Sequence, residues 1–292
     1  MHEHVRREGD RRALAAALVL VASFLGVEVA AGLLADSLAL LADAGHMLSD
    51  AGTLGLALFA AWVAQRPASP ERSFGYRRAE ILAALANGLA LVAVAVWIFV
   101  EAARRLDEPG EPLGGWMLGV GAIGLAVNVA AAAILARRGS ESLNVRAALR
   151  HVLADLAGSL GVIGAGAAIL LTGWTLADPV VSVLIGLLVL ASSWTILRDS
   201  THVLLEATPR GLDADAVGRA MATHPGVREV HDLHVWTITS GFPALSAHVL
   251  VDAGADCHAL RAELERTLRD RFGLEHTTLQ VEHAPGLLDI RR

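Results

Sequence analysis

Long apolar stretches that are almost free of charge fill the first two thirds of this 292-residue chain. A helix needs about 20 apolar residues to cross a bilayer, and each stretch is at least nearly that long. Glu28 is the only charged residue in five of them, whereas the sixth contains Asp43, His46 and Asp50. The hydrophobic content of 54% excludes a typical soluble enzyme. We predict six transmembrane helices, at 13–34, 37–64, 81–100, 113–136, 156–176 and 180–197.

From about residue 209 onward, charged and apolar residues alternate over short distances, which is typical of a domain in water. The helical period predicts two helices, one over 213–223 and one through Leu260, Leu264, Leu268 and Phe272. Period-two alternation predicts strands at 228–239 and 244–252, and shorter runs predict strands at 203–207 and 277–282. The order βαββαβ is that of a ferredoxin-like sandwich. The predicted organisation is an N-terminal segment 1–12, a six-helix membrane domain 13–200 and an α+β domain 201–292.

The positive charges indicate the orientation in the membrane, because cytoplasmic loops carry an excess of them. All 24 are Arg, and twelve on one side oppose Arg104 and Arg105 on the other. The twelve are Arg6, Arg7, Arg11, Arg12, Arg66, Arg72, Arg77, Arg78, Arg137, Arg138, Arg146 and Arg150. Both termini and the tail domain are therefore predicted to be cytoplasmic. No basic patch with interleaved aromatic residues indicates nucleic-acid binding, and the single Cys257 excludes an internal disulfide.

Two identical spacings carry the chemistry: His46 with Asp50 in the second span, and His151 with Asp155 in the fifth. Residues four apart face the same side of a helix, about 6 Å apart along its axis. Two such helices packed together would present two nitrogens and two oxygens, enough for tetrahedral Zn²⁺. The alternative is polar pairing between helices. It is costly, because an ionised Asp in mid-membrane costs about 2.5–3.5 kcal/mol, and a transported cation would offset this.

Several segments carry a resemblance to a known family: "DSLALLADAGHMLSDAGTL", "RSFGYRRAEILAALANG", "SLNVRAALRHVLADLAGSLGVI", "DPVVSVLIGLLVLASSW", "LLEATP" and "HDLHVW". They resemble the cation diffusion facilitator transporters, in particular the zinc-selective bacterial branch. The resemblance implies a homodimer in the lipid bilayer that exchanges cytoplasmic Zn²⁺ for protons by alternating access. His46, Asp50, His151 and Asp155 would be its transport site.

The resemblance also implies a regulatory metal site in the tail, with His231, His248 and Glu282 as ligands, and His234 and His283 as further candidates. Metal there would crosslink the tails of the dimer and raise the transport rate. Two features depart from the family. Arg72 and Tyr76 stand where some members have metal-binding His, so we predict no metal in that loop, and "RRGSESLN" has no His to collect metal.

Other polar residues have open roles. Asp43 lies on the face of His46 and Asp50, where it either orients a ligand or relays protons, or is simply an interfacial carboxylate. Glu28 has a functional role or occupies a polar crevice. Asn87 and Asn128 are expected to hydrogen-bond between helices. His2 and His4 either bind metal weakly or belong to a mobile terminus.

Three classes of protein compete. A carrier explains why ionisable pairs lie inside the membrane, whereas a membrane-anchored sensor does not. An intramembrane zinc enzyme would need an open coordination position and a separate general base, and no HExxH pattern is present. His with Asp favours Zn²⁺, with Co²⁺ or Cd²⁺ as alternative substrates. Proton antiport follows because imidazole must lose its proton to bind metal. The absence of long extensions favours a bacterial plasma (inner) membrane.

Overall fold

The computed structural model describes residues 19, 22–64, 66–108, 110–136 and 143–284. Within these ranges, the side chains of 49–51, 53–61, 64, 134–136 and 143–154 lie outside the description, and those of Asp50 and His151 are among them. The chain forms two compact units. The first contains the described residues up to Leu58 together with Ala86–Leu197, and the second contains Phe59–Leu85 and the chain from Arg198 onward.

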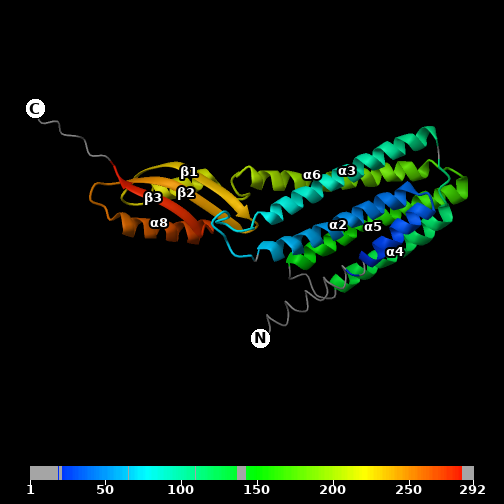
Figure 1. Ribbon diagram of the computed structural model, residues 1–292, viewed down its shortest axis with the longest axis horizontal. Helices are drawn as coiled ribbons and strands as arrows, with labels where there is room; N and C mark the ends of the chain where they lie inside the picture. The colour runs from blue at the N-terminus through cyan, green and yellow to red at the C-terminus, as the bar shows by residue number, and fades with distance from the viewer. Residues whose placement is uncertain (1–18, 20–21, 65, 109, 137–142, 285–292) are drawn as a thin grey trace, which may run out of the picture. The chain divides into compact units, whose positions relative to one another are not determined.

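The first unit is a bundle of helices (Figure 1). A helix over Ala22–Leu34 is followed by α2 (Leu38–Ala64), α3 (Ala79–Asp107), α4 (Gly114–Ala136), α5 (Leu143–Thr172) and α6 (Ala177–Leu204). Four helical segments are long and apolar enough to cross a membrane: Ala79–Asp107, Gly114–Ala133, Asp155–Thr172 and Ala177–Leu204. Over the described residues, Ala22–Leu34 and Leu38–Leu48 are apolar but shorter. A helical membrane domain is therefore confirmed, and the count of six spans stays a prediction.

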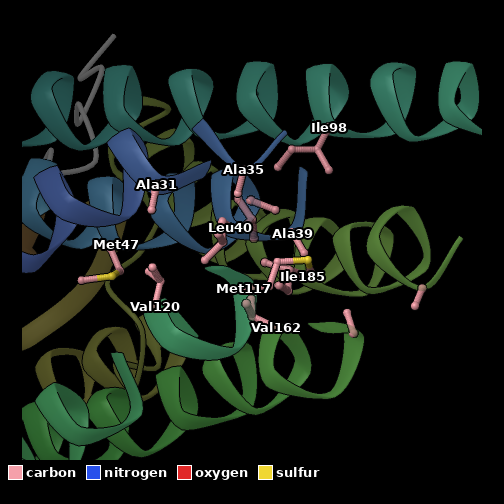
Figure 2. Packing of buried hydrophobic residues seen from close by; sticks show 14 of the residues in the cluster. Ala31, Ala35, Ala39, Leu40, Met47, Ile98, Met117, Val120, Val162 and Ile185 are labelled. Atoms are coloured by element: carbon pink, nitrogen blue, oxygen red, sulfur yellow. The ribbon is translucent and has the colours of Figure 1, made fainter. Parts of the chain in front are cut away.

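The core of this unit is built from small and medium apolar side chains (Figure 2). Ala31 of the first helix and Ala35, just after its end, pack with Ala39 and Leu40 of α2, and Met117 of α4 is also fully buried. Large apolar side chains such as Leu171, on the other hand, are exposed. Small residues at the interfaces and apolar residues on the outer faces are what lipid-embedded helices require, because lipid tails solvate the exterior.

A buried carboxylate fixes the point at which α2 begins. Asp178, at the start of α6, has no exposed surface, and it accepts hydrogen bonds from the Ser37 hydroxyl at 2.6 Å and from the Leu38 and Ala39 amides at 2.9 and 3.1 Å. Arg105 Nη1 lies 3.5 Å from the same carboxylate. The free amides at the start of a helix need such acceptors. This contact sets the depth of α2, and therefore of His46 about two turns further along.

The second unit contains the α+β domain, with α7 (Ala214–Ala222), β1 (Val227–Thr239), β2 (Phe242–Val251), α8 (Cys257–Phe272) and β3 (His276–His283). The sheet order is β1-β2-β3; β1 and β2 are antiparallel, and β2 and β3 are parallel. α8 is the crossover between the parallel strands and lies against the sheet (Figure 1). Leu260, Leu264 and Leu268 form its buried face, as the four-residue period predicts.

The strand predicted at 203–207 is wrong. Helix α6 continues to Leu204, and the chain then turns at Glu206, which has a φ of 55°. The described domain therefore has the order αββαβ and a three-stranded sheet, and it does not show the first strand of the predicted ferredoxin-like order. The short run of Val203, Leu204 and Leu205 is equally compatible with a strand and with a helix end. The preceding helix decides between them, because extending it adds one hydrogen bond per residue.

Candidate metal centre

The membrane unit brings one member of each predicted pair together. His46 Nε2 on α2 lies 3.2 Å from Asp155 Oδ1 on α5, and their side chains are only 15% and 6% exposed. The two residues are 109 positions apart in the chain, so packing of the helices has created this contact. An imidazole nitrogen and a carboxylate oxygen inside an apolar bundle form half of the predicted ligand set.

A second contact fixes how α2 and α5 run past each other. Gly158 lies directly against the Asp43 carboxylate, and a methyl group added there would overlap Asp43 Oδ1. Asp43 precedes His46 by three residues, and Gly158 follows Asp155 by three, so the helices are antiparallel. The same register, continued four residues in each direction, brings Asp50 of α2 to the level of His151 of α5. The side chains of these two residues lie outside the described part.

The structure also shows the surroundings of the other polar residues for which the sequence left the role open. Asn128 of α4 donates to the Ser159 hydroxyl of α5 at 3.4 Å, which confirms the predicted hydrogen bond between helices. Asn87 of α3 is 8% exposed, and its Oδ1 lies close to Gly52 of α2. Glu28 and Asp43 are both buried, at 1% and 4% exposed. His2 and His4 lie outside the described residues.

In the tail, the sheet places two of the predicted ligands side by side. His231 of β1 and His248 of β2 are partners across the antiparallel pair, and their ring centroids are 5.3 Å apart. Glu282 of β3 pairs with Leu250, two residues beyond His248, so it shares a face of the sheet with His248 one row away. His283, by strand alternation, points to the other face. Its Nε2 lies 3.6 Å from Cys257 Sγ and 3.0 Å from the Ala255 carbonyl oxygen.

Sequence reasoning did not single out Asp232. It lies at a bulge between His231 and His234, with a φ of 51°, and its carboxylate lies 3.0 Å from His234 Nε2 and 3.9 Å from His248 Nε2. Asp tolerates the left-handed conformation better than most residues, so a bulge at "HDLH" was a signal that could have been used. Among the described side chains, no group of three or more His, Cys, Asp or Glu is gathered as a metal cluster.

Long apolar helices with a buried contact between His46 and Asp155, in one chain with a small α+β domain, are typical of an integral membrane protein that has a domain in water. Comparison with known families then gives the identity. Residues 14–205 match the cation efflux transmembrane domain, and residues 209–284 match the cytoplasmic domain of cation efflux proteins. The chain belongs to the cation efflux family. It is an integral membrane transporter with a cytoplasmic α+β domain and not an enzyme, as predicted.

Several named relatives match nearly the whole chain. The metal cation efflux system protein CzcD of Cupriavidus metallidurans is 42% identical over 285 residues, which cover 97% of this chain and 90% of the relative. The zinc transporter ZitB of Shigella flexneri is 43% identical, with the same coverage. A cadmium, cobalt and zinc/H(+)-K(+) antiporter of Bacillus velezensis is 39% identical over 289 residues, 97% of this chain and 92% of the relative.

Proposed function

We propose that this transporter exports Zn²⁺ from the cytoplasm in exchange for protons, with His46, Asp50, His151 and Asp155 as a tetrahedral transport site. The contact between His46 Nε2 and Asp155 Oδ1 is the observation that carries the proposal. It joins the two HxxxD segments, and the same antiparallel register aligns Asp50 with His151 about one turn further along. Each level of the site would then contribute one nitrogen and one oxygen.

The ligand chemistry and the relatives both support zinc. Imidazole with carboxylate suits Zn²⁺ in tetrahedral geometry, and Co²⁺ or Cd²⁺ would be alternative substrates because they accept similar donors. One relative is named a zinc transporter, and another is named for cadmium, cobalt and zinc. Two carboxylates balance the charge of a divalent ion, so the loaded site is neutral and its desolvation costs far less than that of a free ion.

Proton exchange follows from competition for the same lone pair. His46 must be unprotonated at Nε2 to bind metal, and metal binding releases whatever proton is there. On the more acidic side of the membrane the imidazole regains a proton, because its ordinary pKa is near 6.5, and metal leaves. The name of the Bacillus velezensis relative includes H⁺ antiport. Alternating exposure of one such site yields export driven by the proton gradient.

The tail forms a second, regulatory zinc site in this proposal, with His231 and His248 as a preformed pair and Glu282 one row away on the same face. Half-exposed ligands suit a site that fills and empties as cytoplasmic zinc changes. Zinc bound there would crosslink the tails of a homodimer and raise the transport rate. Asp232, whose carboxylate faces His248, is an additional candidate ligand.

We place the transporter in a bacterial inner membrane, with six spans and both termini in the cytoplasm. The excess of Arg in the loops on one side supports this orientation. The cytoplasmic family domain at residues 209–284 supports the same side for the tail.

The test is zinc uptake into inside-out or reconstituted vesicles with an imposed pH gradient. We expect flux that requires the gradient, is lost in Asp50→Ala and Asp155→Ala, and persists in Asp107→Ala. Asp107 is a matched control because it is an exposed carboxylate at the end of α3. Flux that survives in both site variants, or ignores the gradient, would overturn the proposal.

A further inference from the structure

The first helix and α2 form a tight antiparallel hairpin, which places Glu28 and Asp43 at the same depth. The chain reverses at Asp36, with a φ of 48°, and the Ser37 amide donates to the Gly32 carbonyl at 3.0 Å. Gly32 lies directly against Leu41 across the hairpin. About one turn further from the reversal, the Glu28 and Asp43 side chains come close enough to interact with each other.

Both carboxyl groups are buried in the bundle core. Glu28 is 1% exposed, and its Oε2 is buried without a hydrogen-bond partner. Apolar side chains lie one turn away on the same two helices, including Ala31, Leu40 and Met47 (Figure 2). The pair therefore has an environment of low dielectric, in which charge is poorly screened.

Helix α5 is shaped to accept the pair. Gly158 has no side chain, and the Asp43 carboxylate occupies the space that a Cβ would fill. Asp155 lies one turn before Gly158, as His46 lies one turn after Asp43. Apart from Asp43 itself, the titratable side chains described on the facing parts of α2 and α5 are His46 and Asp155. The described side chains of α4, from Gly114 to Ala133, include no titratable group. The polar side chain that α4 contributes nearby is Asn128, which hydrogen-bonds to Ser159 of α5.

Two ionised carboxylates in contact would repel each other strongly in such surroundings. A proton shared between the two groups removes this repulsion, because an ionised carboxylate only accepts hydrogen bonds whereas a protonated carboxyl group can donate one. A pair that shares one proton and carries one negative charge avoids the repulsion. Neither Glu28 nor Asp43 is among the four predicted ligands of the transport site.

We propose that Glu28 and Asp43 form a proton site separate from the metal ligands, and that this proton is released when a divalent cation binds at the neighbouring metal centre. The inference rests on the proposed zinc–proton exchange. A cation one helical turn away repels the proton electrostatically. One proton leaves the pair for solvent as metal arrives, the pair gains one negative charge, and the proton returns after metal leaves.

The experiment counts protons released per zinc bound to the full-length protein in detergent, by titration calorimetry in two buffers of different ionisation enthalpy. Glu28→Gln keeps the shape and removes the exchangeable proton, so it should bind zinc and release about one proton fewer per ion. Glu28→Asp should restore the count, and Asp107→Ala should match the native protein. An unchanged count in Glu28→Gln overturns the inference.

A second measurement needs no variant. Infrared difference spectra of the native protein should show a protonated-carboxyl C=O band that disappears on zinc addition. Absence of that loss overturns the proton site. The proposed exchange itself fails by a different result, namely native flux that ignores the pH gradient. Native flux that needs the gradient, together with an unchanged count in Glu28→Gln, would refute only the carboxyl pair.

Discussion

The membrane unit and the tail each bring His and acidic side chains together, but in opposite environments. In the membrane unit, His46 and Asp155 meet at 3.2 Å with 15% and 6% exposure. In the tail, the side chains of His231 and His248 are 44% and 39% exposed, and Asp232 is 61% exposed. A buried polar group is expensive to leave unpaired, whereas an exposed one is solvated at little cost. The contact between His46 and Asp155 is therefore stabilised by the cost of leaving either buried group unpaired, whereas the positions of the tail residues are set mainly by the sheet.

The largest expected effect is on zinc flux when a membrane ligand is removed. In the proposed transport site, Asp155→Asn preserves shape and removes one of the two charges that would balance the divalent ion. Flux in vesicles should then fall by about 100-fold or more, because removing even a group that only hydrogen-bonds to a metal ligand typically costs 10–100-fold. If Asp155→Asn lowered flux as little as the removal of a tail histidine does, the buried and the exposed groups would not differ in importance, and the comparison would fail.

Next is the stability of the membrane unit. Asp178→Ala removes the acceptor of the Ser37 hydroxyl and of two amides and leaves Arg105 without that partner. We expect a loss of about 3–5 kcal/mol, as for other broken buried ion pairs. Thermal unfolding of the full chain in detergent measures it, with Asp107→Ala as the exposed control. Equal unfolding midpoints for the two variants would contradict a stabilising role of the Asp178 contacts.

Two glycines of α5 differ in how closely a neighbouring side chain approaches them, and this difference can be tested. A methyl group at Gly158 overlaps Asp43, whereas Gly164 has nothing within 4 Å of the same position. Gly158→Ala should cost about 1–3 kcal/mol through overpacking and reduce flux. Gly164→Ala should leave both unchanged. Similar behaviour of the two variants would show that α5 does not approach Asp43 as closely as described.

A smaller effect is expected in the tail. His248→Ala should weaken zinc binding by the tail about tenfold, and it should lower flux much less than Asp155→Asn does. The zinc dependence of vesicle flux measures both, and His258→Ala, an exposed His of α8, is the control. Should His248→Ala abolish flux, the tail would be part of the transport path and not a regulator.

The smallest effect concerns the start of α8. Asp256 accepts hydrogen bonds from the Ala259 and His258 amides, and these bonds hold its pKa below the ordinary value. A carboxyl with a lowered folded pKa contributes stability above its unfolded pKa, and this is lost as pH falls through the folded value. Asp256→Asn should keep the cap and lose this pH dependence, whereas Asp256→Ala should lose both. Hydrogen exchange of α8 at two pH values distinguishes these outcomes, and identical profiles would refute the cap.

Much of this could be predicted from the sequence because the signals are local. The HxxxD spacing needs only the helical period, and the apolar stretches need only the thickness of a bilayer. The helices and the three confirmed strands of the tail follow from periodicity in the same way. The prediction of a strand at 203–207 was wrong because a five-residue apolar run is too short to show a period, and α6 extends into it.

The sequence by itself determined most of the candidate metal ligands, and it separated those in apolar stretches from those in the tail domain. Tertiary structure decided which of them meet: His46 with Asp155, Glu28 with Asp43, and Asp232 with His234 and His248. These contacts depend on where α2 begins, on which glycine lets α5 approach and on where β1 bulges. Each is set by packing between segments far apart in the chain, because a helical or strand period fixes the face of a residue but not its depth against a neighbour.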